Sequence, residues 1–264
     1  MGNCLNLPFE HKRALITGGT HGIGRAICLS LANQGCAVAT FSSDMQRVSA
    51  MNGELKKISD KNFCIKSDVF SHQDYINVFD KIQLEWGGID ILINNVGGGG
   101  RWGDECFTKT DEHTWNEVVE KNLYSSIRYT KHFLPHMLKN GWGRVISITS
   151  IYGKDIGGRP WFNVAKSSQN VLMKNLSKNH TYSSRGVTFN SVAPGPIYIK
   201  DTGWAKLKHE DPDTFNDYVK QNIPREVMGT PEEVADIVVF LCSDKSKLIN
   251  GAVIPCDGGQ GISI

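Results

Sequence analysis

The chain has 264 residues, of which 40% are hydrophobic and 21% are charged, and its formal net charge at pH 7 is +2. This length and composition are enough to bury a large core, so we expect one α/β domain that covers residues 1–264. Because the charges are spread along the chain without a basic block, neither nucleic acid nor an anionic membrane is an expected partner.

The cysteines and the apolar runs indicate the compartment. The seven cysteines are odd in number and show no C-x-x-C spacing, which fits reduced thiols rather than a disulfide frame or a zinc site, so we expect no metal. No apolar run approaches about eighteen residues and the N-terminus lacks a secretion-signal pattern, so we expect a cytoplasmic protein. The cysteines are Cys4, Cys28, Cys36, Cys64, Cys106, Cys242 and Cys256.

Short apolar or β-branched runs alternate with longer helical patterns along the whole chain. This alternation is typical of a parallel sheet that is covered by helices on both faces. We therefore predict a doubly wound sheet of seven parallel strands, without an internal repeat or linker that would mark a domain boundary. The predicted strands are residues 14–17, 37–41, 63–66, 91–94, 145–148, 187–192 and 253–256.

The first predicted strand ends in a glycine-rich turn, TGGTHGIG at residues 17–24, that begins a helix. Gly18 permits a tight turn, Gly22 lets the backbone approach a pyrophosphate, and Gly24 lets the helix pack closely on the strand. The alternative is a purely structural glycine turn, which this position between a strand and a helix disfavours. The residues that we assign to a dinucleotide here are Gly18, Thr20, His21, Gly22, Ile23 and Gly24.

The end of the second predicted strand indicates which dinucleotide binds. A carboxylate at this position would accept from a ribose 2′-hydroxyl and repel a 2′-phosphate, but Ser42 and Ser43 stand there. Their hydroxyls, with His21 and Arg47 nearby, could hold a phosphate, which favours NADP and leaves NAD possible. The alternative is that the serines are ordinary turn residues and that Arg47 is a solvated helix charge.

Polar or glycine-rich sequences follow the third, fourth and sixth predicted strands, at the edge where a parallel sheet binds ligands. They are Asp-Val at residues 68–69, Asn-Asn-Val-Gly at residues 94–97 and Pro-Gly-Pro-Ile at residues 194–197. The ligand-binding candidates from these segments are Asp68, Val69, Asn95, Gly97, Pro194, Gly195 and Ile197.

Two further segments could cover a substrate. The loop at residues 97–103 contains four consecutive glycines before Arg101 and Trp102, so it either covers the site or forms an unstructured tip. Residues 198–223 are polar and poorly periodic, and we interpret them as a substrate lid. The basic residues around this mouth suggest an anionic substrate, and the alternative is that they are ordinary solvated charges; they are Arg101, Arg159, Lys206 and Lys208.

The run GRVISITSIYGKDIGGRPWFNVAK at residues 143–166 carries the strongest motif. Ser150 lies just past a predicted strand, and Phe162 and Lys166 are four residues apart on one face of a helix that begins at Pro160. With the glycine turn, Asn-Asn-Val-Gly and Asn122, this layout resembles the short-chain dehydrogenase/reductase family, in particular its 3-oxoacyl-[acyl-carrier-protein] reductase-like members. The resemblance covers essentially the whole chain.

The resemblance implies a Rossmann-type fold, an NADP or NAD cofactor, a small-molecule substrate and a homo-oligomer, either a dimer or a tetramer. In the family, the serine orients a carbonyl, a tyrosine donates the proton, and the lysine lowers the pKa of the tyrosine and holds the nicotinamide ribose. The asparagine distorts its helix and holds a water linked to the lysine. Ser150, Lys166 and Asn122 occupy three of these places, whereas Phe162 stands at the tyrosine position and cannot donate a proton.

By the same resemblance, Asp68 binds the adenine ring, the Pro-Gly turn lies beside the nicotinamide, and Thr202 contacts its carboxamide or the phosphates. We therefore expect an oxidoreductase that acts on a carbonyl or hydroxyl of a small polar molecule.

Three explanations of Phe162 remain open. The first is a divergent enzyme with another proton donor. It is favoured because the loop between Ser150 and the helix is one residue shorter than in the family pattern. The second is a catalytically silent dinucleotide-binding sensor or scaffold, and the third is an engineered Tyr-to-Phe variant of an ordinary reductase. The candidate donors, in order, are Tyr152, Tyr198, Lys166, Lys154 and Asp155.

Overall fold

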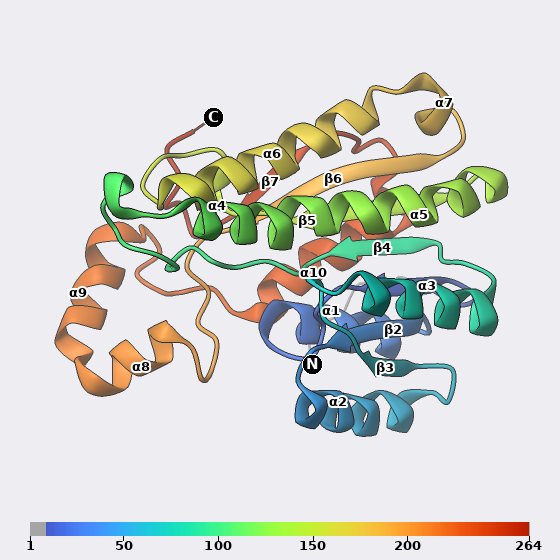
Figure 1. Cartoon of the computed structure of the whole chain (residues 1–264), viewed down its shortest axis with the longest axis horizontal. Helices are drawn as coiled ribbons and strands as arrows, with labels where there is room; N and C mark the ends of the chain where they lie inside the picture. The colour runs from blue at the N-terminus through green and yellow to red at the C-terminus, as the bar shows by residue number, and fades with distance from the viewer. Residues whose placement is uncertain (1–8, 264) are drawn as a thin grey trace.

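The computed structural model describes residues 9–263, so Cys4 lies outside the described residues. These residues form a seven-stranded parallel sheet with the order β3-β2-β1-β4-β5-β6-β7, as predicted (Figure 1). The strands are β1 (Arg13–Ile16), β2 (Ala37–Ser42), β3 (Phe63–Lys66), β4 (Ile91–Asn94), β5 (Gly143–Ile148), β6 (Val187–Pro194) and β7 (Val253–Cys256).

The predicted bounds of β3, β4 and β7 match the structure, and the other strands differ at their ends. The largest differences are that β5 begins two residues earlier, at Gly143, and that β6 continues two residues further, to Pro194. Glycine and proline disfavour strand prediction, but Gly143 pairs with Val187 of β6 and Pro194 pairs with Cys256 of β7.

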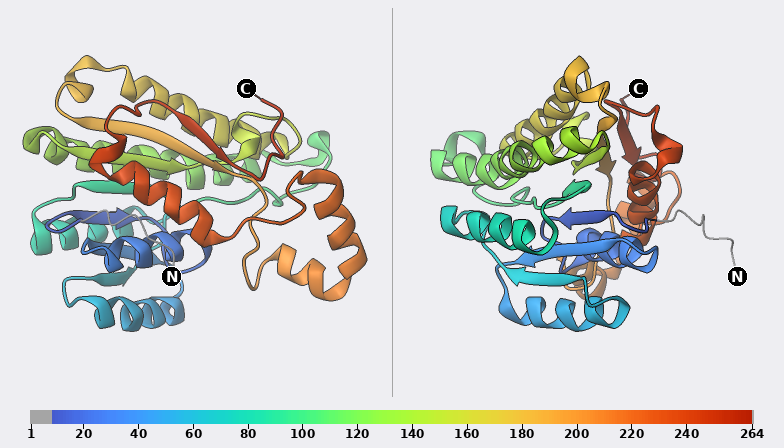
Figure 2. Two further views of the ribbon diagram at one scale, coloured as in Figure 1. Left: turned by 180° about the vertical axis from the view of Figure 1, so that it is seen from behind. Right: turned by 90° about the vertical axis from the view of Figure 1, so that its right-hand side faces the viewer.

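Helices cover both faces of the sheet, which gives three layers (Figure 2). Side chains of β4 alternate between the layers: Ile91 and Ile93 pack with α1, α2 and α10, whereas Leu92 packs with α3, α5 and α6. The helices are α1 (Gly22–Asn33), α2 (Met45–Ile58), α3 (His72–Trp86), α4 (Glu112–Val119), α5 (Ser125–Asn140), α6 (Pro160–Ser177), α7 (His180–Ser183), α8 (Gly203–Glu210), α9 (Pro212–Asn222) and α10 (Pro231–Cys242).

The segment from residue 198 to 223, which the sequence predicts to be irregular, contains two helices, α8 and α9. They project beyond the carboxyl ends of the strands, away from the sheet (Figure 1). Phe215, Val219 and Ile223 form a small apolar cluster with the half-buried Trp204 and Leu207. Two short amphipathic helices therefore pack on each other here, and the many charged residues on their exposed faces obscured this periodicity in the sequence.

Between α4 and α5 the chain makes one π-helical turn, η2 (Glu120–Tyr124), and a short 3₁₀ turn, η3 (Ile151–Gly153), follows β5. The resemblance to the family implied that Asn122 distorts its helix. The structure has this distortion at Asn122.

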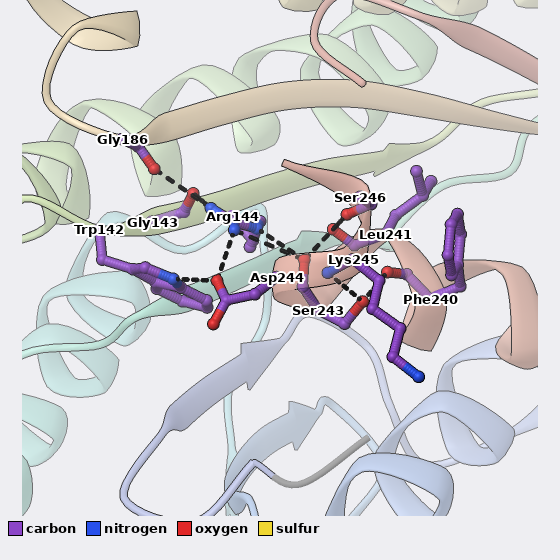
Figure 3. A network of polar contacts seen from close by, with 10 residues as sticks. All are labelled: Trp142, Gly143, Arg144, Gly186, Phe240, Leu241, Ser243, Asp244, Lys245 and Ser246. Carbon is purple, nitrogen blue, oxygen red and sulfur yellow. Dashed lines mark hydrogen bonds and ion pairs between the residues drawn. The ribbon is translucent and has the colours of Figure 1, made fainter. Parts of the chain in front are cut away.

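A buried arginine lies at the amino end of β5, opposite the carboxyl ends of the strands where such a sheet binds ligands (Figure 3). Arg144 is 2% exposed and donates to the carbonyl oxygens of Gly143 (2.9 Å) and Gly186 (3.1 Å) and to the Asp244 carboxylate (3.1 Å). The ring of Trp142 lies 4.3 Å from its guanidinium carbon. These contacts tie β5 to the start of β6 and to the turn after α10.

The order of the strands reverses direction between β1 and β4, and ligands bind at such a switch point in doubly wound sheets. In the part of the chain that the structure describes, no helix is both long and apolar enough to cross a membrane.

Candidate active site

The turns after β1 and β4 are bonded to each other at the switch point. The Asn95 side-chain nitrogen donates to the carbonyl oxygens of Thr17 (2.9 Å) and Gly18 (3.1 Å). Gly18 and Gly22 have φ values of +66° and +53°, which side chains rarely adopt. A Cβ on Gly24 would lie 2.6 Å from the Gly18 carbonyl oxygen, so close packing of α1 on the turn requires glycine there.

A cavity of about 350 Å³ lies at this crevice. Residues from the ends of β1, β2, β3 and β4 line it, in agreement with where the sequence placed the dinucleotide. The predicted residues that line it are Gly18, Thr20, His21, Ser42, Ser43, Arg47, Asp68, Val69, Asn95 and Gly97, and the others are Phe41, Ser67, Phe70, Val96 and Lys121.

An acid that sequence reasoning passed over lies beside this cavity. Asp44 caps α2, because its carboxylate accepts from the backbone nitrogens of Gln46 (2.9 Å) and Arg47 (3.1 Å). The same carboxylate pairs with the Arg47 side chain at 3.5 Å. Asp44 is therefore engaged at the start of α2, while the Ser42 hydroxyl accepts from the Asp44 backbone nitrogen at 3.2 Å.

Three predicted cofactor residues contact protein groups instead of lining the cavity. The Thr202 hydroxyl donates to the Ile199 carbonyl at 2.7 Å, and the Ile197 side chain packs into the core. Ile23 packs against the same core, and Ile199 covers Gly22, where a Cβ would lie 3.0 Å from the Ile199 side chain. Their roles toward a dinucleotide stay predictions.

A second cavity, of about 690 Å³, lies beside the first, at the carboxyl ends of β5 and β6. It brings together Ser150, Tyr152 and Phe162 with the Pro194-Gly195 turn, and the lid helices contribute Trp204 and Tyr218. The other lining residues are Gly100, Arg101, Glu105, Ile151, Gly157, Gly158, Arg159, Pro196 and Gln260.

Lys166 is buried behind Phe162. Its Nζ donates to the Ile148 carbonyl (3.0 Å) and to the Gln169 side-chain oxygen (3.0 Å), and it lies 5.7 Å from the centre of the Phe162 ring. Burial lowers the pKa of Lys166 to about 7. A Cβ on Gly97 would lie 2.8 Å from Nζ, so only glycine lets the backbone after β4 approach the amine so closely.

Asn122 lies at the centre of the π-helical turn and is fully buried. Its side chain donates to the carbonyl oxygens of Gly98 (2.9 Å) and Val118 (2.8 Å) and accepts from the Gly98 nitrogen (3.2 Å). Its main-chain oxygen accepts from the Gln169 side chain at 2.9 Å.

Of the substitute donors, Tyr152 alone reaches the second cavity together with Ser150. Its ring lies against the loop of Gly157 and Gly158, where added Cβ atoms would be 3.2 Å and 3.1 Å from ring carbons. Burial, with a smaller effect of Tyr218, raises the pKa of the Tyr152 phenol.

The remaining donor candidates are engaged elsewhere. The Ser263 hydroxyl donates to the Asp155 carboxylate, which also accepts from the backbone nitrogens of Ile262 (2.9 Å) and Ser263 (3.1 Å), and these bonds, the hydroxyl's first, lower the pKa of Asp155. Tyr198 packs in the lid cluster, with the Lys208 amine 5.1 Å from the centre of its ring. Lys154 and Asp155 line a different hollow, beside α6.

The glycine loop lies over the second cavity and is held by aromatic packing. Trp161 is fully buried and donates to the Gly99 carbonyl at 3.3 Å, and Trp102 packs against the same cluster as Trp161 and Phe162. The loop is therefore structured and forms a wall of the cavity. This agrees with the alternative in which the loop covers the site, and not with an unstructured tip.

The four basic residues that the sequence placed around the mouth separate into two groups. Arg101 and Arg159 line the cavity, and Arg101 lies over the Trp204 ring at 5.6 Å. Arg159 also donates to the Trp102 carbonyl at 2.7 Å and pairs with Glu105. Lys206 and Lys208 do not line this cavity; Lys206 pairs with Glu210 at 3.8 Å.

Gln169 and Lys121 are site residues that sequence reasoning missed. Lys121 lines the first cavity and lies 4.8 Å from the centre of the Trp102 ring, and burial lowers its pKa. Its place beside Asn122 in the sequence was an available signal. Gln169 follows Lys166 by three residues, which puts both on one helix face.

A glycine turn at the switch point of a doubly wound sheet, next to a buried lysine and a serine-bearing cavity, defines a dinucleotide-binding protein of the Rossmann type. A family model described as enoyl-(acyl carrier protein) reductase matches residues 18–260. The chain is 33% identical over 258 residues to the 3-oxoacyl-[acyl-carrier-protein] reductase of Aquifex aeolicus, with 97% of this chain and 100% of that protein covered. The chain belongs to the short-chain dehydrogenase/reductase family of oxidoreductases.

Solved structures agree with this assignment. The L-sorbose reductase of Gluconobacter frateurii, complexed with NADPH and L-sorbose, has a TM-score of 0.88 at 25% identity, with 98% of this chain and 100% of that chain covered. A 7α-hydroxysteroid dehydrogenase complexed with NADH and 7-oxo glycochenodeoxycholic acid has a TM-score of 0.86 at 26% identity, with 99% and 98% covered. Both NADPH and NADH therefore occur among similar structures.

Proposed function

We propose that the protein is an NADP-dependent oxidoreductase that acts on a carbonyl or hydroxyl group of a small polar substrate through a site that lacks the tyrosine acid. The observation that carries the proposal is the arrangement of Ser150 and Tyr152 in a cavity of about 690 Å³. Phe162 lines this cavity, and Lys166 is buried behind it. The Lys166 amine lies next to Gly97, which lines the first cavity. A substrate group in the second cavity would therefore lie next to the end of a dinucleotide in the first.

The residues present fit a nicotinamide dinucleotide. The first turn of α1, which begins at Gly22, would offer backbone nitrogens to phosphates, as helix N-termini generally do. Gly97 leaves room beside the Lys166 amine that a Cβ would fill. The bound dinucleotide would supply the hydride, and Lys166 would hold its ribose.

Within the second cavity, Ser150 would orient the reacting oxygen and Tyr152 would exchange its proton. The Tyr152 phenol is protonated near neutral pH, which is the state that a proton donor needs during carbonyl reduction, although burial raises its pKa and so makes it a weaker acid than an exposed tyrosine. Arg101 would attract an anionic group on the substrate, because it lines the cavity.

A silent nucleotide sensor is the second candidate, and the missing hydroxyl of Phe162 favours it. A positioned general acid contributes typically about 10² to 10⁴ in rate, so its loss alone could stop catalysis while leaving cofactor binding intact.

Turnover separates the two candidates. We expect calorimetry to show saturable NADPH binding and a panel of small polar ketones and alcohols to show multiple turnovers with at least one compound. Tyr152→Phe should then lower kcat by about 10² or more if this phenol donates the proton. Binding without turnover on a broad panel would favour the sensor, and unchanged kcat in Tyr152→Phe would remove this donor.

NADP preference can be tested in the same titration. We expect NADPH to bind about tenfold or more tightly than NADH, because Ser42, Ser43 and Arg47 line the first cavity and the acid next to them, Asp44, is engaged at the start of α2. Ser43→Asp should reverse this preference by repelling a 2′-phosphate, whereas Gln46→Asp on the neighbouring helix turn serves as the charge-matched control. A native preference for NADH would contradict the assignment.

Phe162→Tyr distinguishes a divergent enzyme from an ordinary reductase that has simply lost its tyrosine. In a divergent enzyme the pocket is shaped around the phenyl ring, so we expect unchanged or lower activity from the added hydroxyl. A simple loss of tyrosine would instead be rescued by about 10² or more. Steady-state kinetics on any turned-over substrate, with Phe162→Leu as a size control, decides between them.

We also propose a homo-oligomer, because α6 and the turns beside it expose an apolar face. We propose that a second copy of this chain binds to this face. A strip of aliphatic side chains on α6 lies there, beside a shallow cavity that other residues of α6 line. The exposed members are Tyr124, Ile156, Val164 and Val171. Sedimentation should show a dimer or tetramer that Val164→Glu with Val171→Glu dissociates, whereas the paired change Lys56→Glu with Lys57→Glu, on the exposed side of α2 and away from α6, should not; a monomeric native protein would refute the proposal.

A further inference from the structure

Gln169 connects the π-helical turn to the buried lysine. Its side chain is fully buried on α6, one turn after Lys166. The side-chain oxygen accepts from Lys166 Nζ at 3.0 Å, and the side-chain nitrogen donates to the Asn122 main-chain oxygen (2.9 Å) and to Ser126 Oγ (2.8 Å). One amide therefore bridges two residues to which the family pattern gives roles.

These contacts determine which way the amide points. Both hydrogens of the Gln169 nitrogen are used, and Ser126 Oγ donates in turn to the Asn122 oxygen at 2.8 Å. Turning the amide over would direct its NH₂ group at the Lys166 amine, donor against donor. The negative end of the amide dipole therefore faces Lys166.

Side chains donate to the carbonyl oxygens around the π-helical turn η2. Asn122 Nδ2 donates to the Val118 carbonyl (2.8 Å) and Ser125 Oγ donates to the Lys121 carbonyl (2.6 Å). The Asn122 carbonyl receives two such donors, one from Ser126 and one from Gln169. Both of its lone pairs are thus occupied by protein groups.

We propose that Gln169 is a positioning residue that links Asn122 to Lys166 directly, as a side-chain substitute for the bridging water of the family pattern. Together with the Ile148 carbonyl, it fixes two of the three hydrogens of the Lys166 ammonium group. The third hydrogen of the ammonium group would then point toward Gly97 and could donate to the nicotinamide ribose, which would bind there. The proposal rests on the proposed function, because it assigns Gln169 a part in holding the same dinucleotide.

The charged side chains on the elements around Lys166 have other partners. Glu120 pairs with Arg128, Lys121 lies over the Trp102 ring, and the Tyr152 ring lies against Gly157. Burial is the cause of the lowered Lys166 pKa, so the neutral amide of Gln169 faces the amine without a competing charge. A change at residue 169 should therefore act on Lys166 directly.

The test measures Lys166 itself in the ligand-free protein, by NMR of lysine labelled with ¹³C at Cε, with Lys166→Met to identify the signal. Gln169→Glu should raise the titration midpoint by about one unit or more, because a carboxylate favours the ammonium form. Gln169→Met keeps the size and removes the acceptor, so it should lower the midpoint by about one unit. The NADPH dissociation constant of Gln169→Met should rise about tenfold.

Ser126→Ala is the matched control, because it touches Gln169 and Asn122 but not Lys166, and it should move the midpoint by less than about 0.3 units. Shifts of both Gln169 variants in one direction, or a Ser126→Ala shift as large as that of Gln169→Met, would overturn the proposal. If Gln169→Met does not fold, an unshifted midpoint in Gln169→Glu is sufficient to refute it. The titration needs no substrate, so absence of turnover refutes the proposed function without touching this result.

Discussion

The burial of one amine constrains the whole site. Lys166 is 3% exposed, and a charged or polar group so far from water must have hydrogen-bond partners within the protein. Two acceptors supply them: the Ile148 carbonyl at the end of β5, and Gln169 on the same helix. Because Gln169 is also bonded to the π-helical turn, the position of the amine depends on β5, α6 and η2 together. The Gly97 backbone is then able to approach because no side chain stands between it and the amine.

The features set by short stretches of sequence were predictable. The glycine turn at residues 17–24, the ends of β3, β4 and β7, and the position of Ser150 each depend on residue types within a few positions of one another. Contacts between distant segments were not predictable in this way. The bond from Gln169 to Asn122 joins residues 47 positions apart, and its geometry depends on how α6 packs on η2. The lid helices were missed for a related reason, since their apolar face is defined only by packing of α8 on α9.

The surroundings of Phe162 are mainly aromatic side chains that form one wall of the second cavity. It packs with Trp102 and Trp161, and the Trp161 ring lies 5.9 Å from that of Trp115. An aromatic wall of this kind excludes water from the place where a hydride would move, and it strengthens the electrostatic effect of the few polar groups that remain. In the proposed reaction, Tyr152, Ser150 and Lys166 would therefore act in a less polar medium.

The outer wall of the second cavity is held in a different way. Gln260 of the C-terminal segment donates to the Tyr218 hydroxyl on α9 at 3.0 Å, while Asp155 accepts from the backbone nitrogen of Ile262 beside the loop that carries Ser150 and Tyr152. The end of α9 also contacts this segment, because a Cβ on Gly258 would lie 3.0 Å from the Ile223 side chain, and the backbone nitrogen of Arg225 donates to the Gly258 carbonyl at 3.4 Å. The C-terminal segment is thus bonded on one side to the helices over the cavity and on the other side to the loop of Ser150 and Tyr152. The positions of both walls of the cavity therefore depend on the same few residues near the C-terminus.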